Sequence, residues 1–337
     1  MSTMQAALIV RHGGPEVLEV TRVETPEPGP GDVRLAVKAC ALNHLDIFVR
    51  RGMPGIEFNF PHVSGGDVVG VVDKCGASVD ASLSGKTVLV DPNIDNDALG
   101  EGKRWGALAE YVIVPADSLI PLDTVPDDLH AYVALPIAYG TAHRMLFTRC
   151  RLHAGETIAV LGASGGVGVA CVQLGHATGA RVIACSGSDE KLGRLRQFGA
   201  GETVNTSTED FSKRVWELTG KHGADVVIDY TGKETWPSSI RCTKPGGRLA
   251  TCGATTGYDA STDLRYVWTR ELDILGCNGW MREDLLALIA MVRDGGLRPV
   301  ISSVYPLSRI AEAEAELEDR RALGKVIVVP DEVMHAA

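Results

Sequence analysis

The chain of 337 residues lacks the features of a nucleic-acid or membrane protein. Asp and Glu outnumber Lys and Arg by 43 to 33, so the net charge is −10 and the pI is about 5.4. Because an acidic surface repels polyanions, we expect no nucleic-acid partner. No apolar run reaches the roughly 18 residues of a spanning helix, and residues 1–10 lack the basic start of a secretory signal. The sequence therefore predicts a cytoplasmic protein with no membrane partner.

The cysteines form no C-x-x-C pair, which argues against a zinc ribbon and a redox motif of that type. They are scattered through mostly apolar segments, as is typical of buried, reduced thiols and not of a disulfide framework. The eight positions are Cys40, Cys75, Cys150, Cys171, Cys185, Cys242, Cys252 and Cys277. The overall hydrophobic content of 45% and mean hydropathy of +0.05 are ordinary for an α/β protein.

The length and the patterning indicate two domains. Residues 1 to about 120 contain many short strand-like runs separated by Pro/Gly turns such as residues 25–31, which favours a rolled-up β domain. Helical segments then alternate with strands, and the pattern predicts a doubly wound parallel sheet. The six expected strands are 157–161, 181–185, 202–205, 225–229, 247–251 and 273–276. We expect a β domain over residues 1–125, completed by residues 278–337 that include a returning strand at 324–329, and an α/β domain over residues 126–277.

A dinucleotide-binding fingerprint lies at the first strand of the α/β domain. The apolar run Thr157 to Leu161 is followed by a glycine turn over residues 162–168, a helix to Ala177 and a second strand. Glycines let the backbone approach a pyrophosphate, and the helix N-terminus offers N–H groups to the anion. Ala163 takes the first position of the G-x-G-x-x-G pattern. The candidate cofactor-binding residues are Ser164, Gly165, Gly166, Val167 and Gly168.

The end of the second strand favours NADPH over NADH. NAD sites usually have an acidic residue there, whereas this chain has Ser186, Gly187 and Ser188, followed by Lys191. Hydroxyls and a cation can bind a 2′-phosphate. The acidic pair at 189–190 is interpreted as the first turn of the next helix, where carboxylates suit the dipole. The alternative is that Lys191 belongs only to a solvated helix face.

Several motifs in order make the chain resemble the medium-chain dehydrogenase/reductase superfamily, in its zinc-free quinone oxidoreductase-like branch that includes zeta-crystallin. The matching segments are residues 41–46, 63–72, 106–111, 163–168 and 324–328. The resemblance covers nearly the whole chain. It implies a GroES-like β domain, a Rossmann domain of doubly wound parallel sheet, and an active-site cleft between them.

Zinc-dependent members of this superfamily need a thiolate and an imidazole on the β domain and a further cysteine after it. In this chain the first position is Asn43, the Gly-His-Glu motif is replaced by Gly65, Gly66 and Asp67, and the third position falls near Ile137. The cysteines of a structural zinc lobe are also missing. An amide, a hydrogen and an alkyl group do not make a zinc site, so we expect no metal.

The resemblance also implies candidate catalytic residues. Asn43 matches an asparagine that similar quinone reductases place in the cleft, where its amide could hold a substrate oxygen; the alternative is that it only satisfies a turn. Asp46 matches the family's aspartate, as an architectural hydrogen-bond acceptor or a general acid. Many relatives have a tyrosine where this chain has Phe48, which cannot donate a hydrogen bond. Tyr139 could take over that role or could pack in the core, and otherwise water supplies the proton.

Further cofactor contacts follow from position. Gly253 and Ala254 come after the fifth strand, where backbone groups would line the nicotinamide, and Asn278 comes after the sixth, near the substrate end. Lys325 matches a family lysine that can reach the cofactor, with a solvent-facing side chain as the alternative.

Together these features predict an enzyme: a zinc-independent, NADPH-dependent reductase of quinones or α,β-unsaturated carbonyls, acting by direct hydride transfer to a small-molecule substrate. One alternative is an enoyl-CoA or acryloyl-CoA reductase, which needs a basic groove for the CoA phosphates; the candidates are Arg50, Arg51, Lys103 and Arg104. The other is a non-enzymatic, RNA-associating NADPH-binding protein, which the acidic balance disfavours. The resemblance implies a homodimer or homotetramer.

Overall fold

The computed structural model describes residues 2–53, 59–94, 97–122 and 128–336. The chain forms two compact units: residues up to 137 together with those from 299 onward, here called the β unit, and residues 138–298, the α/β unit. The predicted boundary between residues 125 and 126 lies outside the described residues. The second boundary follows Arg298 and not residue 277, because helix α9 (Arg282–Arg293) packs in the α/β unit, where Asp284 and His143 share a hydrogen bond of 2.7 Å.

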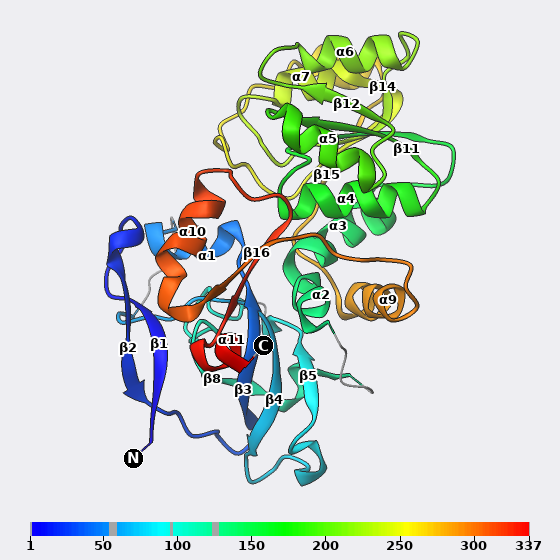
Figure 1. Ribbon diagram of the computed structural model, residues 1–337. Coiled ribbons are helices and arrows are strands. Elements are labelled where there is room, and N and C mark those ends of the chain that lie inside the picture. The colour runs from blue at the N-terminus through cyan, green and yellow to red at the C-terminus, as the bar shows by residue number, and fades with distance from the viewer. Residues whose placement is uncertain (1, 54–58, 95–96, 123–127, 337) are drawn as a thin grey trace. The chain divides into compact units, whose positions relative to one another are not determined.

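The β unit is built on a sheet in the order β16-β17-β3-β4-β5-β9, with β8 paired to β3 (Figure 1). The last strand β17 pairs antiparallel with β3, which confirms that the chain returns to this unit. Its strands are β1 (Thr3–Ile9), β2 (Leu18–Glu24), β3 (Asp32–Ala41), β4 (Asp67–Cys75), β5 (Thr87–Val90), β6 (Asn93–Ile94), β7 (Asp97–Ala98), β8 (Tyr111–Pro115), β9 (Leu119–Pro121), β16 (Ile301–Pro306) and β17 (Lys325–Val329). Its helices are α1 (His44–Arg51), α2 (Leu129–Val133), α10 (Ile310–Glu318) and α11 (Asp331–Ala336).

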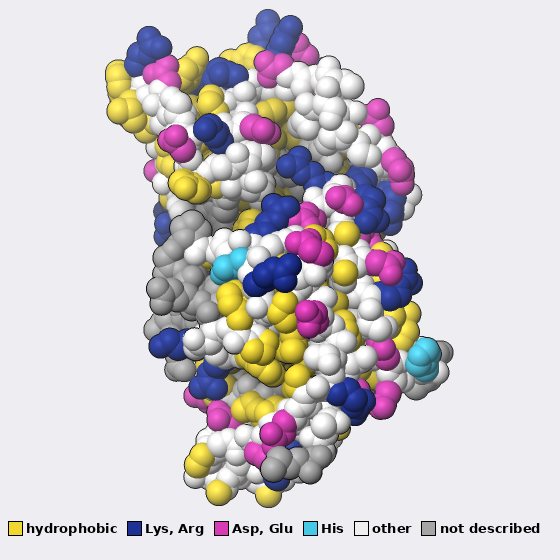
Figure 2. All heavy atoms as spheres, turned by 90° about the vertical axis from the view of Figure 1, so that its left-hand side faces the viewer, with side chains coloured by type: hydrophobic (Ala, Val, Ile, Leu, Met, Phe, Trp, Pro, Cys, Tyr) yellow, Lys and Arg dark blue, Asp and Glu magenta, His cyan; other side chains and the backbone are white. Residues whose placement is uncertain are grey.

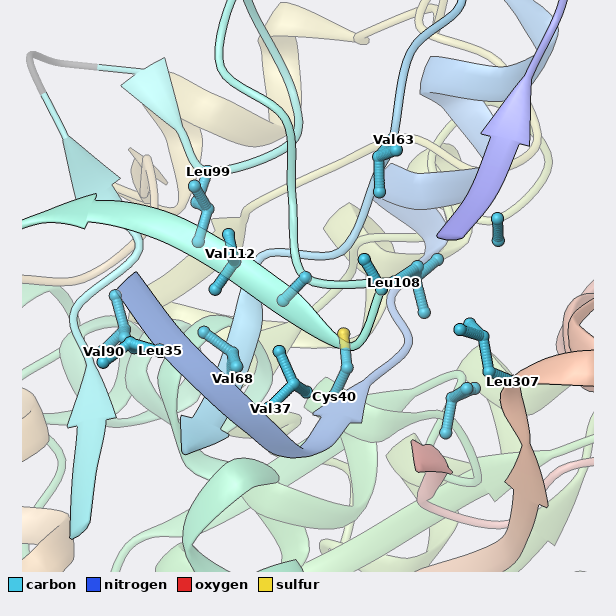
Figure 3. Close-up of a cluster of buried hydrophobic side chains, with 14 of the residues drawn as sticks. Leu35, Val37, Cys40, Val63, Val68, Val90, Leu99, Leu108, Val112 and Leu307 are labelled. Carbon is cyan, nitrogen blue, oxygen red and sulfur yellow. The ribbon is translucent and has the colours of Figure 1, made fainter. Parts of the chain in front are cut away.

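The core of the β unit lies between these strands. Along β3, Val33, Leu35 and Val37 alternate with half-buried residues, as the period of two in the sequence predicts. Figure 3 shows Leu35 and Val37 among buried residues of β4, β5 and β8, and Leu307, which follows β16, also belongs to this cluster. Fully burying a side chain of this kind stabilises the fold by about 1.5–3 kcal/mol, so the packed sheet provides a rigid base for the loops at its ends.

The α/β unit contains a six-stranded parallel sheet in the order β12-β11-β10-β13-β14-β15, the doubly wound arrangement predicted from the sequence. Its strands are β10 (Thr157–Leu161), β11 (Arg181–Ser186), β12 (Glu202–Asn205), β13 (Ala224–Ile228), β14 (Thr243–Thr251) and β15 (Asp273–Gly276). Its helices, besides α9, are α3 (Gly140–His143), flanked by π-helical turns, α4 (Gly166–Ala177), α5 (Asp189–Gln197), α6 (Phe211–Leu218), α7 (Trp236–Cys242) and α8 (Leu264–Thr269). In such a sheet the carboxyl ends of the strands hold the ligand.

No helix within the described residues is both long enough and apolar enough to cross a lipid bilayer.

Candidate active site

The glycine turn after β10 is packed too closely to admit side chains at two of its glycines. Gly162 has φ +64°, a conformation that favours glycine, and a Cβ added to Gly168 would lie 2.4 Å from the carbonyl oxygen of Gly162. Helix α4 begins at Gly166 with no side-chain cap, so its first N–H groups are offered to a ligand. The residues predicted from the fingerprint, Ser164, Gly165, Gly166, Val167 and Gly168, all lie in this turn and first helical turn, which fits a pyrophosphate group.

Tyr230 fixes the turn and was not found from the sequence. Its hydroxyl donates to the carbonyl of Gly162 at 2.6 Å, and burial raises the pKa of Tyr230 well above its usual range. Tyr230 follows β13, which is the neighbour of β10 in the sheet. Carboxyl ends of adjacent parallel strands meet at one edge, and that rule would have brought Tyr230 to the glycine turn.

The residues predicted to select the cofactor gather at the end of β11. Ser186 donates from its hydroxyl to the Oγ of Ser164 at 3.1 Å, so the strand end contacts the glycine turn directly. Ser188 is the N-cap of α5 and accepts a bond from the backbone N–H of Lys191 at 3.4 Å. Asp189 does begin α5, as expected from the sequence. Its carboxylate accepts a hydrogen bond of 2.7 Å from the Asn205 side chain, a contact that the sequence did not reveal.

Gly253, Ala254 and Asn278 follow β14 and β15 as predicted, at the same edge of the sheet. The carbonyl of Gly253 accepts a hydrogen bond from the hydroxyl of Thr251 at 2.8 Å, and the side chain of Asn278 is exposed.

The β unit contains a buried polar cluster of Asn43, Asp46, Asp67 and Lys325. Lys325 Nζ donates to Asn43 Oδ1 at 2.6 Å and to Asp67 Oδ2 at 3.1 Å. Asp67 is fully buried, and its other carboxylate oxygen accepts from the backbone N–H of Ile137 at 2.9 Å. The cluster forms because β3, β4 and β17 are neighbours in the sheet and each strand supplies one member at or next to its end.

The amide of Asn43 is fully engaged inside this cluster. An ammonium can only donate, so the atom that faces Lys325 is the amide oxygen. The Nδ2 group donates to Asp67 Oδ2 at 2.9 Å and to the carbonyl of Ala41 at 3.2 Å. Both donor hydrogens and the acceptor therefore have partners in the β unit. The assignment of Asn43 as a hydrogen-bond donor to substrate stays a prediction, and the structure gives this side chain other partners.

Asp46 connects two backbone segments. Its carboxylate accepts the N–H of Asn43 and the N–H of Gly65, each at 2.8 Å, which is the architectural arrangement considered from the sequence. Burial, with the negative charge of Asp67 nearby, raises the pKa of Asp46 to about 6, although the two N–H donors and Lys325 oppose the shift.

Two residues with alternative assignments occupy defined positions. Tyr139 belongs to the α/β unit, is buried, and donates to Gln173 Oε1 at 2.6 Å; Gln173 in turn donates to the carbonyl of Arg298 at 2.9 Å. Lys325 is only 2% exposed, so the solvent-facing alternative is wrong. Its contact with a cofactor stays a prediction.

The three positions at which zinc-dependent relatives have ligands do converge, but they offer no metal site. A Cβ on Gly66 would lie 3.0 Å from the side chain of Ile137 and 3.1 Å from the carbonyl of Leu99, so a larger side chain has no room there. The side chain of Asn43 is bound to an ammonium. Within the residues that the structure describes, no group of three His, Cys, Asp or Glu side chains is placed to hold a metal ion. The side chains at these positions therefore do not fit a catalytic zinc.

Two family models match the chain: "Alcohol dehydrogenase GroES-like domain" over residues 29–126 and "Zinc-binding dehydrogenase" over residues 166–294. A quinone oxidoreductase from Pseudomonas aeruginosa is 32% identical, covering 95% of this chain and 97% of the relative. A crystal structure of an NAD-dependent alcohol dehydrogenase is 38% identical, with a TM-score of 0.89 and coverage of 97% and 99%.

A structure of a 2-octenoyl-CoA carboxylase reductase with NADP and 2-octenoyl-CoA is 26% identical, with a TM-score of 0.86 and coverage of 98% of this chain and 88% of the other. Together with the GroES-like and Rossmann folds of the two units, these matches identify the chain as an oxidoreductase that belongs to the medium-chain dehydrogenase/reductase superfamily, in its quinone oxidoreductase-like branch.

Proposed function

We propose that this protein is a zinc-independent, NADPH-dependent reductase of quinones or α,β-unsaturated carbonyls. The observation that carries the proposal is the bond from the Lys325 ammonium to the amide oxygen of Asn43, at the first of the zinc-ligand positions. A cation at that position would meet an ammonium within hydrogen-bond distance of the same oxygen, so charge repulsion opposes a metal there. Without a Lewis acid, alcohol oxidation is difficult, whereas an electron-poor acceptor can take a hydride directly.

The glycine turn supports the cofactor assignment. Because Gly162 and Gly168 carry no side chain, the turn packs closely, and a pyrophosphate would bind the first N–H groups of α4. The bound nicotinamide supplies the hydride. The nicotinamide end would be lined by Gly253, Ala254 and Asn278. The chain would also orient the cofactor and the substrate and exclude water from the site.

The preference for NADPH over NADH rests on the end of β11. Ser186, Gly187 and Ser188 place hydroxyl and backbone groups there, and Lys191 lies in the first turn of α5. Asp189 is the nearest carboxylate, and its hydrogen bond to Asn205 partly offsets its negative charge. One similar structure is titled as NAD-dependent and another contains NADP, so the family alone does not decide between the two.

The proton that completes the reduction comes from water in this proposal. Both N–H donors of Asn43 are used within the β unit, and the hydroxyl of Tyr139 is bonded to Gln173. The position that many relatives fill with tyrosine is Phe48, which has no donor. An enolate or hydroquinone anion is basic enough to take its proton from solvent.

The relative with bound 2-octenoyl-CoA favours a thioester substrate as the second candidate. Of the cations considered for a CoA groove, however, Arg50 is fully buried, bonded to Glu314 at 2.5 Å and to Glu318 at 2.9 Å. Arg51 also pairs with Glu318. On the face drawn in Figure 2, Lys and Arg side chains are interspersed with Asp and Glu side chains. These observations favour a smaller, uncharged acceptor.

The test is NADPH oxidation by EDTA-treated protein with a small quinone, a conjugated enone and an enoyl thioester, with NADH as the cofactor control. We expect turnover of the quinone or the enone that survives the chelator and is faster with NADPH. Loss of activity with EDTA and its recovery with zinc would contradict zinc independence. Turnover of the thioester alone would select the second candidate. We further propose a cytoplasmic homo-oligomer, which sedimentation of the purified protein would test.

A further inference from the structure

Two cysteines occupy matching positions just beyond the ends of β14 and β15. These strands are parallel, with Thr251 opposite Gly276 in the last pair of the register. The next residues along each strand are Cys252 and Cys277. The N–H of Cys277 donates to the carbonyl of Thr251 at 2.9 Å, so the ladder reaches as far as the second cysteine. Adjacent strands are about 4.8 Å apart, which lies within the Cα separation of about 4.4–6.8 Å found in disulfides.

The two thiols also point to the same side of the sheet. Side chains of paired residues on neighbouring strands share a face, because the pleat alternates with a period of two. The electrostatics agree with this placement: after burial, the neighbouring Cys277 is the largest cause that raises the pKa of Cys252, to about 12. Both side chains are free thiols in the structure; Cys252 is partly exposed and Cys277 is buried.

We propose that Cys252 and Cys277 are a redox pair that forms a reversible disulfide and thereby lowers hydride transfer at the nicotinamide end of the site. The disulfide itself follows from the strand register. Its effect on activity rests on the proposed function, because each cysteine directly precedes a segment assigned there to the nicotinamide: Gly253 and Ala254 after the first, and Asn278 after the second.

The chemistry needs a two-electron oxidant, for which we propose a peroxide. The thiolate of Cys252, a partly exposed residue, attacks a peroxide oxygen; the O–O bond breaks, and a sulfenic acid and hydroxide form. The Cys277 sulfur then attacks the sulfenic sulfur, the S–O bond breaks, and the hydroxyl leaves as water once it has taken a proton. With hydrogen peroxide, two thiols become one disulfide and the peroxide becomes two molecules of water. A small dithiol reverses the change by thiol–disulfide exchange.

The disulfide should displace the strand ends. Cβ atoms in a disulfide lie about 3.8 Å apart, whereas side chains on adjacent strands start from the strand spacing of about 4.8 Å. Forming the bond therefore draws the ends of β14 and β15 together by about 1 Å. A displacement of this size at a reacting centre can slow the chemistry by about 100-fold.

The reaction should accelerate with pH. Because the thiolate attacks and the pKa of Cys252 is raised to about 12, only a small fraction of this thiol is ionised near neutral pH. At pH values below this pKa, the rate of disulfide formation should rise about tenfold for each unit by which the pH is increased.

The first test counts thiols and maps the bond, and it needs no enzymatic activity. Treatment of the full-length protein with hydrogen peroxide at pH 8.5 should remove two of its eight thiols, measured after denaturation, and a peptide linking Cys252 to Cys277 should appear by mass spectrometry. In Cys252→Ser and in Cys277→Ser, peroxide should not remove two thiols, and no linked peptide should appear, because one partner of the disulfide is missing. Cys75→Ser removes a partly exposed cysteine of the β unit and should behave like the wild type. A bond from Cys252 to Cys171, whose thiol lies near enough to interact with that of Cys252, would overturn the proposal, as would retention of all eight thiols.

The second test measures NADPH oxidation before and after peroxide, each protein being compared with its own untreated sample. The wild type and Cys75→Ser should lose at least tenfold in kcat and recover with a dithiol. Cys252→Ser and Cys277→Ser should lose less than twofold. A mapped disulfide with unchanged turnover would overturn the effect on hydride transfer. If no acceptor is reduced by any sample, the proposed function fails, while the thiol counts and the peptide map still decide for or against the redox pair.

Discussion

The candidate functional residues of the two units differ in the groups that they contribute. In the β unit the candidate residues are charged or polar side chains that satisfy one another: Lys325, Asp67 and Asn43 form a closed set of hydrogen bonds away from water. In the α/β unit the candidate residues contribute mainly backbone, which at Gly162 and Gly168 is packed too closely to admit a side chain. The first arrangement is sensitive to removal of a partner, and the second to addition of atoms.

This difference determines what each unit tolerates. A buried charge is stable only while its partner is present, because the protein interior cannot replace water as a solvent for it. A phosphate cradle is stable without its ligand, because its N–H groups belong to a helix and strand that fold for other reasons. Substitutions can therefore separate the two kinds of site by their effects on stability and on cofactor binding.

The largest effect is expected from Lys325→Met. It leaves the carboxylate of Asp67 fully buried without its cation, which should lower the free energy of unfolding of the β unit by about 3–5 kcal/mol. The measurement is urea denaturation followed by circular dichroism. The matched control is Lys74→Met, which breaks the pair with Glu27 whose side chains are 51% and 62% exposed. That change should cost at most about 1 kcal/mol. Equal losses in the two variants would contradict the comparison between buried and exposed pairs.

The second effect is a pH dependence at Asp46. The folded-state pKa is raised from an ordinary 3.8 to about 6, so the protonated form is favoured by folding. The resulting stability is fully present below pH 3.8 and is lost as the pH rises through about 6, a change of about 3 kcal/mol. Asp46→Asn removes this titration, together with one pH-independent hydrogen bond. The difference in unfolding free energy between wild type and Asp46→Asn should therefore move in favour of the variant between pH 4 and pH 7.

The urea midpoints of both proteins, measured across this pH range, give the difference in unfolding free energy. The contributions of the titratable groups that the two proteins share cancel in this difference. A constant difference would mean that the carboxylate of Asp46 is not desolvated by folding.

The fold was predictable because its signals are local. The central strands β10, β11 and β13 are mostly apolar runs bounded by turn residues, and the glycine turn lies beside the first of them. The alternation of these strands with helices predicts a doubly wound parallel sheet, which the observed strand order confirms. The return of β17 to the β unit was expected from the motif at 324–328 and is confirmed by its pairing with β3.

The contacts of the candidate site were much less predictable. Asn43 and Lys325 were each identified, but their bond joins residues 282 positions apart and depends on the register of β17 against β3. Asp67 was noticed only as a substitution in the metal motif, and its role as the carboxylate partner of Lys325 needs the third dimension. Arg50 belonged to a candidate basic groove, yet it lies buried against Glu314, 264 positions away. Side-chain partners of this kind leave no periodicity in the sequence.

The third prediction concerns a methyl group added to the glycine turn of the α/β unit. In Gly168→Ala the new Cβ would lie 2.4 Å from the carbonyl oxygen of Gly162, so α4 must shift away from the turn. We expect the NADPH dissociation constant to rise at least tenfold, or about 1.4 kcal/mol, as measured by cofactor fluorescence. Gly193→Ala is the control, because its Cβ meets nothing within 4 Å and the helix α5 should gain slightly in stability. Unchanged NADPH binding by Gly168→Ala would argue that the cofactor does not use this turn.

The smallest effect separates capping from cofactor selection at Ser188. This residue caps α5, so Ser188→Ala should lower the free energy of unfolding by about 1 kcal/mol. Ser188→Asp keeps a capping oxygen and should leave stability within about 0.5 kcal/mol of the wild type. Its negative charge would repel a 2′-phosphate, however, so the ratio of NADPH to NADH affinity should fall in Ser188→Asp more than in Ser188→Ala. Titrations of both cofactors, together with urea denaturation, measure the two roles independently. An unchanged ratio in both variants would place the 2′-group of the cofactor away from the end of β11, and Ser188 would then be a capping residue alone.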